Sequence, residues 1–477
     1  MSASPALAAF GEAWARREML PASRGSVMHE LRAAAMNRFE RLGLPTVRDE
    51  SWHYSNLRAL SLRAFRPAPT NTAASAAGVT ASPAAASSGA AAASTVDIAL
   101  PTSWLDPAGM AHADTQAPGG LQPDAAWPVL HLLDGVPLAM MSTPQPGMRL
   151  QNLSWLEQTD PQHLARLSPP ASDAEQQRWL LLNTALYEDG VHVRVTGECP
   201  RPLLIVHHAP AAGAATLSNP RVIIETEAHS RGIVIEHHLG GAEQELLRNS
   251  VCIVQLAAGA HLEHYRVFSN GANTTHFDHL LVRQAADSSF LQHTVALGGG
   301  FVRGTLEAAL RAPGAALDSH ALIAVNAADH CDGVNLVSHE AARTRSRQTA
   351  RLIAGQHGRA IFNSKVVVAP GAQKTDSVQS CRGLLLSAGA EIDTRPQLEI
   401  HADDVKCAHG ATTGRLDPDM LFYLLSRGLD RSAAQSLLVF AFLADVLTGM
   451  SLQSVRGAIE AHLVSQLPDS DILRQFR

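Results

Sequence analysis

The spacing of hydrophobic residues changes twice along the chain and divides it into three parts. From Ser26 to Leu42, hydrophobic residues recur at intervals of three and four, which is typical of one face of a helix. From about Val191 to Ile400, short runs rich in Val, Ile and Leu, such as VHVRV, GIVIEHH and SVCIVQL, are separated by turn residues. After Gly414 the helical spacing returns. The pattern predicts a mainly β protein with helical regions at both ends.

The β region also contains a repeated turn. Gly-Ala pairs are separated by intervals close to one or three units of roughly 18 to 19 residues, and they begin at Gly241, Gly259, Gly314, Gly371 and Gly389. A fixed period predicts a β-solenoid, in which each repeat stacks on its neighbour. Other Gly-Ala pairs, such as that at Gly271, do not fit this period, and a β-sandwich would also give short strands with regular turns. The period favours the solenoid.

Two helices are predicted after the β region. Asp430 is a suitable N-cap for the segment that starts at Arg431, and Gly449 is a suitable stop. A second helical pattern runs from Ser451 to Leu467. The first helix is hydrophobic around much of its circumference, so we expect it to be covered on more than one side, by this chain or by a partner.

Composition marks one further boundary. Between Pro67 and Thr95 the chain consists of Ala, Ser, Thr, Gly, Pro, Asn and Val, so ordering it would bury little. The patterns together predict five regions, namely an N-terminal helical domain at 1–66, a low-complexity linker or insertion at 67–97, a mixed connecting region at 98–190, a β-helix core at 191–413 and a C-terminal helical domain at 414–477.

Charge and hydropathy exclude several classes of protein. The formal net charge is -6 and basic residues are scattered, which is unlike a nucleic-acid-binding surface. The N-terminus lacks the features of a signal peptide. The most hydrophobic run, from Leu437 to Leu447, is shorter than the about 20 residues of a membrane-spanning helix. We therefore expect a cytoplasmic protein that binds neither nucleic acid nor membrane.

The cysteines are spread along the chain without a CxxC pair, which predicts reduced thiols and no self-contained cluster or structural zinc site. In DDVKCAHGAT, Cys407 and His409 are two positions apart, so on a strand they share one face and offer a thiolate and an imidazole to iron or zinc. The alternative is that Cys407 is a small buried residue and His409 an ordinary polar neighbour.

Cys381 is a second candidate, because the charge of the adjacent Arg382 can lower a thiol pKa. The alternative is an inert thiol in a strand. The glycine-rich run LGGGFVRGT lacks the Lys-Ser/Thr of a nucleotide-binding loop, and neither G-x-S-x-G nor H-E-x-x-H occurs. The missing nucleotide-binding motif predicts that this chain binds no nucleotide and does not hydrolyse ATP.

The stretch from Ala372 to Asp430 resembles the signature of the SufB/SufD family of iron-sulfur cluster assembly proteins. Shorter segments match the family at Trp179 to Val193, Leu246 to Val267 and Gly358 to Val368, and LPTVRDESWHYSNL, from Leu44 to Leu57, resembles the SufD branch. The resemblance implies a right-handed parallel β-helix flanked by helical domains.

The resemblance also implies a non-catalytic subunit of the SUF scaffold complex, with a SufB-type scaffold protein and a SufC-type ABC ATPase as partners. His409 matches the functional histidine of the SufD branch and Cys407 the accompanying cysteine, which implies a transient contact with iron or a cluster shared with the SufB-type partner. The ATPase would hydrolyse ATP and dock on the C-terminal helices, where Phe440 and Phe442 are candidate contacts.

Cys381 departs from the SufD pattern, because it lies on the strand where SufB-type relatives carry their key cysteine. A SufB-like scaffold that builds a cluster itself therefore stays open. The other alternative is a β-helix enzyme that acts on carbohydrate or acyl substrates, and the missing secretion signal and the lack of an evident group of catalytic carboxylates argue against it. The resemblance also leaves open whether the chain forms a homodimer when it is alone.

Overall fold

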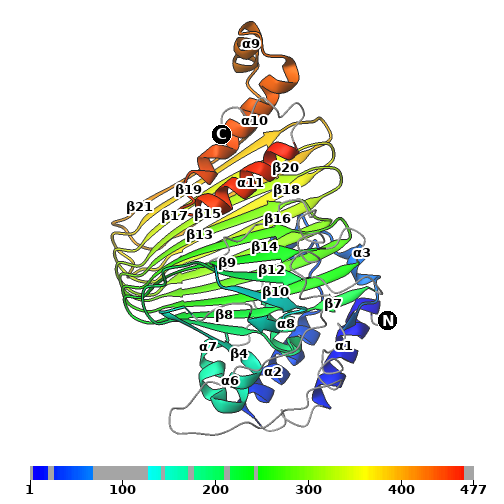
Figure 1. The fold of residues 1–477 in the computed structure, drawn as a ribbon, viewed down its shortest axis with the longest axis vertical. Coiled ribbons are helices and arrows are strands. Elements are labelled where there is room, and N and C mark those ends of the chain that lie inside the picture. Colours follow the sequence, from blue (N-terminus) through cyan, green and yellow to red (C-terminus); the bar gives the residue numbers. More distant parts are fainter. Residues whose placement is uncertain are drawn as a thin grey trace, which may run out of the picture.

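The computed structural model describes residues 4–19, 26–67, 127–140, 145–169, 177–208, 215–240 and 245–466. The region expected to be a linker, residues 67–97, lies outside the described residues except for Pro67, and so does Gly241. The fold is mainly β with helices towards both ends, and its core is a β-solenoid, which confirms the predicted fold class (Figure 1).

The solenoid consists of two sheets, and each coil of the chain contributes one strand to each sheet. Sheet A has 11 strands, and its main order is β20-β18-β16-β14-β12-β10-β8-β5-β4. Its strands are β1 (Arg66–Pro67), β4 (Met148–Asn152), β5 (Val191–Val195), β7 (Thr216–Ser218), β8 (Arg221–Thr226), β10 (Leu246–Leu256), β12 (Thr274–Gln284), β14 (Phe301–Leu310), β16 (His330–His339), β18 (Arg359–Val368) and β20 (Glu391–Ile400).

Sheet B has 10 strands in the order β21-β19-β17-β15-β13-β11-β9-β6-β2-β3. Its strands are β2 (Val129–Leu133), β3 (Val136–Met140), β6 (Leu203–His208), β9 (Arg231–Leu239), β11 (His261–Ser269), β13 (Ser289–Leu297), β15 (Ala316–Val325), β17 (Arg345–Ala354), β19 (Asp376–Leu385) and β21 (Lys406–Gly414). Apart from the antiparallel pairs β2–β3 and β4–β5, neighbouring strands run parallel.

The predicted repeat of 18 to 19 residues is wrong. In sheet B, His261 pairs with Ser289, Ser289 with Ala316, Ala316 with Arg345, Arg345 with Asp376 and Asp376 with Lys406, so one coil takes 27 to 31 residues. Each coil contains two strands and two turns. Gly259, Gly314 and Gly371 lie in turns that lead from sheet A to sheet B, whereas Gly389 lies in a turn that leads from sheet B to sheet A.

The turns that lead from sheet A to sheet B explain why glycine positions do not reveal the coil length. One residue in each of six successive turns has a left-handed backbone, and these are His229, Gly259, Asp287, Gly314, Arg343 and Lys374. Each of their N–H groups donates to a carbonyl of the turn in the next coil, at 2.6 to 3.3 Å. The stack of turns therefore supplies hydrogen bonds that offset the cost of positive φ in residues other than glycine.

Hydrophobic side chains from both sheets fill most of the solenoid lumen. Because parallel strands are in register, each side chain lies beside its counterpart in the next coil. One such column in sheet A consists of Val193, Ile224, Val254, Val282, Ala308, Val337, Val366 and Leu398. Burial of each Val or Leu in it stabilises the fold by about 1.5–3 kcal/mol relative to exposure.

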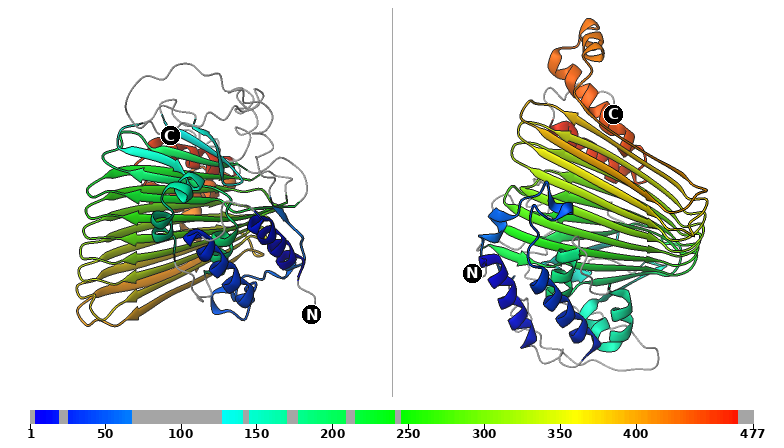
Figure 2. Two further views of the ribbon diagram at one scale, coloured as in Figure 1. Left: turned by 90° about the horizontal axis from the view of Figure 1, so that it is seen from below. Right: turned by 180° about the vertical axis from the view of Figure 1, so that it is seen from behind.

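Helices from the N-terminal part cover the outer face of sheet A (Figure 2). Trp179 of α8 stacks on Phe277 of β12 with ring centroids 3.6 Å apart. Ser26 caps the first of the predicted helices by accepting a hydrogen bond from the His29 N–H at 3.1 Å. These helices are α1 (Pro5–Glu18), α2 (Val27–Leu42), η1 (Glu50–Trp52), α3 (Arg58–Ser61), α6 (Leu153–Thr159), α7 (Pro161–Leu167) and α8 (Arg178–Leu186).

Helices from the C-terminal part cover the outer face of sheet B. The covering helices are α10 (Arg431–Leu447) and α11 (Gln453–Ser465), and they follow α9 (Pro418–Ser426). Val439 and Leu443 of α10 pack against Leu322 and Ile353 of the sheet, and Asp430 caps the helix as predicted. α9 projects beyond the end of the solenoid (Figures 1 and 2).

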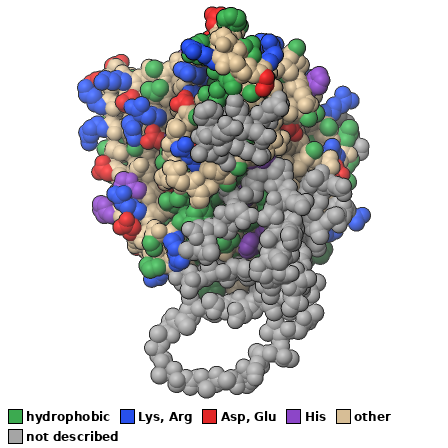
Figure 3. All heavy atoms as spheres, turned by 45° about the horizontal axis from the view of Figure 1, so that its top comes forward, with side chains coloured by type: hydrophobic (Ala, Val, Ile, Leu, Met, Phe, Trp, Pro, Cys, Tyr) green, Lys and Arg blue, Asp and Glu red, His purple; other side chains and the backbone are tan. Residues whose placement is uncertain are grey.

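The outer surface of the described residues carries mixed charge. On the face visible in Figure 3, Lys and Arg side chains lie next to Asp and Glu side chains. None of the described helices is both long enough and hydrophobic enough to span a membrane.

Candidate functional site

The last coil of the solenoid ends in an open edge. β20 pairs with β18 and β21 pairs with β19, and neither terminal strand has a further partner among the described strands. In β21 every residue from Ala408 to Gly414 is exposed, whereas the strands of earlier coils are largely buried. A free strand edge presents backbone N–H and C=O groups that can pair with a strand of another chain.

Cys407 and His409 lie on the lumen side of this terminal coil. Cys407 pairs in register with Ser377 and His409 with Gln379, and both of these β19 residues are buried in the lumen. In-register residues of parallel strands point to the same face, so the thiol and the imidazole share one face, as their spacing predicts. His409 is exposed, and Cys407 is half-buried, which raises its pKa.

Cys381 faces the lumen one coil further in. It pairs in register with Ala411 and is only 5% exposed. Burial raises the pKa of its thiol to about 12. The neighbouring Arg382 is exposed, since adjacent residues of a strand point to opposite faces, so its charge does not lie on the face of the thiol. Cys381 therefore shares a face with Cys407 and His409, and its thiol keeps its proton unless a bound metal displaces it.

A column of polar side chains runs through the lumen to His409. In-register pairing stacks one residue from each of six odd-numbered strands, and these are His264, Gln292, Ser319, Gln348, Gln379 and His409. The first five are buried. Hydrogen bonds link Ser319 to Gln292 at 2.8 Å and Asn335 to Gln348 at 3.0 Å. A register slip would move these buried polar groups out of the lumen and is therefore disfavoured. The column thus also fixes the strand face on which His409 lies.

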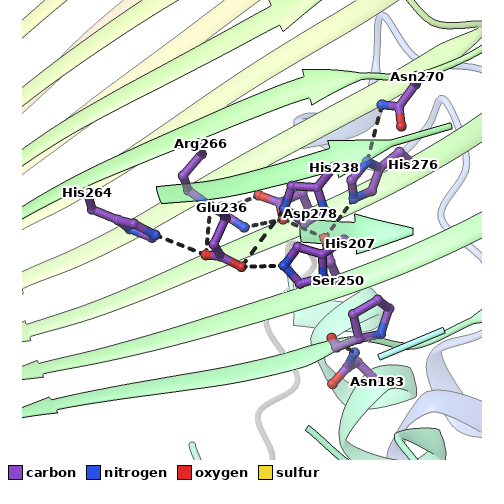
Figure 4. Close-up of polar contacts among 11 residues, drawn as sticks. Asn183, His207, Glu236, His238, Ser250, His264, Arg266, Asn270, His276 and Asp278 are labelled. Carbon is purple, nitrogen blue, oxygen red and sulfur yellow. Dashed lines mark hydrogen bonds and ion pairs between the residues drawn. The ribbon is translucent and has the colours of Figure 1, made fainter. Parts of the chain in front are cut away.

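The inner end of this column meets a buried cluster around Glu236 (Figure 4). One carboxylate oxygen of Glu236 lies 3.0 Å from His264 Nε2, and the other lies 2.9 Å from His207 Nε2. Arg266 lies beside the same carboxylate at 3.3 Å and binds Asp278 with two hydrogen bonds of 2.5 and 2.6 Å. His207, Glu236 and His238 form one group of metal-ligand type in the lumen, and Glu236, Cys252 and His264 form a second.

Electrostatics keep Glu236 ionised and the surrounding imidazoles neutral. Burial alone would raise the pKa of Glu236, but the charge of Arg266 and hydrogen bonds from His207 and His264 hold it well below its usual value. Burial lowers the pKa of His207 and of His264. Since a guanidinium already lies against the carboxylate, the cluster has a charge partner of its own and forms a buried polar network.

The residues expected to contact a partner lie on α10. Phe440 and Phe442 are half-buried, and Phe442 packs against the hydrophobic side chains that lie between α10 and sheet B. The large hydrophobic side chains that are most exposed near this helix belong to α9, namely Met420 at 58%, Phe422 at 71% and Tyr423 at 56%. Aromatic residues exposed on a projecting helix are typical of protein-binding surfaces.

Comparison with known proteins places these features in one family. The family model described as "SUF system FeS cluster assembly, SufBD core domain" matches residues 208–442, and that described as "SufBD protein N-terminal region" matches residues 13–70. The "Iron-sulfur cluster assembly protein SufD" of Escherichia coli (strain K12) is 32% identical over 304 residues, which cover 63% of this chain and 71% of the relative. The chain belongs to the SufB/SufD family.

Other relatives are similar over shorter parts. An iron-sulfur cluster assembly SufBD family protein of Synechocystis is 28% identical over 58% of this chain and 64% of the relative. The SufD of Bacillus subtilis (strain 168) is 40% identical over 96 residues, which cover 20% of this chain and 22% of the relative. The family therefore agrees with the resemblance that the sequence motifs carry.

Sequence reasoning missed the inner cluster of this SufB/SufD chain. The histidines at 207, 238 and 264 are far apart in sequence. Their proximity to Glu236 can be predicted only when the length of one coil is known. A usable signal was the alternation in VIEHH and HLEHYR, which places Glu236, His238 and His264 on inward positions of neighbouring strands.

The buried histidines predict that this SufB/SufD chain loses stability in mild acid. Burial lowers the pKa of His237 and of His339 to about 4, and that of His208 and of His293 to about 3, from 6.5. Below about pH 6.5 the unfolded chain therefore binds more protons than the folded chain, so stability is fully present above that pH and falls towards pH 4. The melting temperature should drop between about pH 7.5 and about pH 5.

Calorimetry at a series of pH values measures this effect. A His339→Gln variant serves as the matched comparison, and it should take up about one proton fewer on unfolding in acid. A melting temperature that stays constant or rises as the pH falls would contradict the assignment of these imidazoles as neutral.

Proposed function

We propose that this chain is the SufD-like subunit of a SUF scaffold complex. It binds a SufB-type partner through the edge formed by β20 and β21, and it presents His409 and Cys407 to iron or a nascent cluster at that interface. The observation that supports this proposal most directly is the free edge of the solenoid with a thiol and an imidazole on its lumen face.

The number of candidate ligands in the terminal coil supports a cluster that is shared between two chains. Iron-sulfur clusters are held by four ligands, usually thiolates with occasional imidazoles. The terminal strand offers two candidate ligands, and Cys381 lies on the same face one coil further in. A partner strand that adds to the edge of β21 would bring its own side chains beside His409. Cargo held between the two chains could then be released when the interface opens.

We also propose that ATP is hydrolysed by a SufC-type partner. The glycines at 298–300 lie in the turn between β13 and β14, and a strand follows them. A phosphate-binding glycine loop instead leads into the N-terminus of a helix. This supports a chain that binds no nucleotide and acts as a scaffold.

The C-terminal helices are the proposed docking surface for that ATPase. Phe422 and Tyr423 of α9 are exposed and Phe440 of α10 is half-buried, while Phe442 of α10 packs partly against sheet B. A projecting helix with exposed aromatic side chains offers anchors that a groove on another protein can bury.

A SufB-like scaffold is the second candidate, because Cys381 adds a third soft or borderline ligand to the face that holds Cys407 and His409. In that case the isolated chain would assemble a complete, stable cluster.

The first test is the His409→Ala substitution. The imidazole is exposed and makes no side-chain hydrogen bond to another described residue. The complex with the SufB-type and SufC-type proteins should therefore form, while its iron and sulfide content falls roughly tenfold. His401→Ala is the matched control, because His401 is an exposed histidine of the same coil that pairs with Glu399 at 3.0 Å.

Iron and sulfide are measured in the purified complex after anaerobic reconstitution and by complementation in cells. Normal cluster content with His409→Ala would contradict the ligand role. A complete cluster on the isolated chain would instead favour the SufB-like candidate.

The second test concerns the ATPase surface. Phe422→Asp or Phe440→Asp should weaken binding of the SufC-type ATPase by at least about 2 kcal/mol, or ~30-fold, because a charge would have to be buried in the contact. Phe442→Asp should also weaken it, with some loss of stability because of its packing.

Leu62→Asp is the control, since Leu62 is a hydrophobic residue 68% exposed near the N-terminal helices. Binding is measured by calorimetry with the purified ATPase. Equal affinity of the Phe422, Phe440 and Leu62 variants would refute this docking surface.

A further inference from the structure

A second group of metal-ligand side chains lies on the outer face of sheet A, among its first coils. It consists of His163 from α7, His192 from β5 and Glu225 from β8. In the strand order of the sheet these elements are at the opposite end from β20, so the group is separate from the site at the open edge.

The three ligand atoms have the spacing of a metal site. His163 Nε2 lies 3.1 Å and His192 Nε2 lies 3.2 Å from the same oxygen of Glu225, and all three atoms are within 4.8 Å of one another. Tetrahedral zinc with bonds of about 2.0–2.1 Å separates its ligand atoms by about 3.3 Å. The two contacts to Glu225 are therefore within a few tenths of an ångström of the spacing that a tetrahedral ion requires.

The fold holds each ligand in place. Asp160 caps α7 by accepting a hydrogen bond from the His163 N–H at 2.9 Å, and Leu164 of the same helix is buried against Ile223 of β8. β5 and β8 are paired in register, which fixes His192 and Glu225 two positions apart along neighbouring strands. The ligands thus come from a capped helix and two paired strands and not from a loop.

Charge and access also favour an ion here. Hydrogen bonding from His192 lowers the pKa of Glu225, so the carboxylate is ionised. Its ion-pair partners among the described residues are the two imidazoles, because the nearby Arg194 pairs with Glu227 at 2.9 Å. The lumen cluster differs, since Arg266 already lies against Glu236 there. His163 and Glu225 are 23% and 22% exposed, which lets an ion and a water ligand reach them.

We propose that His163, His192 and Glu225 bind a divalent transition metal, Zn²⁺ or Fe²⁺, with solvent as the remaining ligand. Two imidazoles and one carboxylate with an open position are a ligand set that both metals use in proteins. The bound ion would tie α7 to sheet A. This proposal does not depend on the function proposed above.

The test is a titration of the full chain with Co²⁺, a spectroscopic probe for such sites, in a Cys407→Ser/His409→Ala background that removes the candidate ligands of the terminal coil. We expect one equivalent to bind with the absorption of a nitrogen and oxygen ligand set and without a thiolate-to-metal band. His163→Ala should weaken its binding by about 100-fold or more, and Glu225→Gln should do the same while retaining a hydrogen-bonding side chain.

The matched control is His53→Ala, because His53 is an exposed histidine whose ring packs edge-on against that of Tyr54. It should leave the affinity unchanged. Zn²⁺ should raise the melting temperature of the background protein and of the His53 variant but not of the His163 variant. Equal Co²⁺ affinity in the His163 and His53 variants, or the absence of a bound equivalent in the background protein, would overturn the proposal.

Discussion

In-register stacking of two-stranded coils is the constraint on which the rest of this structure depends. Every lumen residue lies beside the equivalent residue of the next coil, so a single position in the coil becomes a column along the solenoid. Columns of Val, Ile and Leu supply the hydrophobic core, and the column that ends at His409 is polar along most of its length. A slip by one residue would turn every lumen side chain outward, which is why the register is strongly specified.

Stacking also determines which surfaces stay free. The N-terminal helices cover the outer face of sheet A, and α10 and α11 cover the outer face of sheet B. The free edge of β20 and β21 then combines two properties that are costly in a chain on its own, unpaired backbone groups and exposed lumen residues. Ion pairs such as Lys365 with Glu399 place charges near this edge, and such charges disfavour indiscriminate strand pairing. A partner strand on this edge, as proposed above, would offset both costs by pairing the backbone groups and covering the lumen residues.

Much of the fold could be predicted from the sequence, because local chemistry determines it. Ser26 and Asp430 are helix caps in the structure, and the alternation of strand residues places Cys407 and His409 on one face. The coil length could not be predicted from glycine positions alone, since Asp287, Arg343 and Lys374 adopt the same left-handed backbone conformation as Gly259 and Gly314. The clusters around Glu236 and Glu225 depend on pairings between distant strands, which single-sequence patterns do not reveal.

Hydrogen exchange of the β21 amides, with and without the SufB-type partner, tests the central claim most directly. In the free chain, the β21 amides that point away from β19 should exchange rapidly, because they lack a neighbouring strand. When the partner is added, these amides from Lys406 to Gly414 should become protected, while those of the central strand β13 should change little. Unchanged exchange in β21 within an intact complex would contradict the assignment of the open edge as the interface.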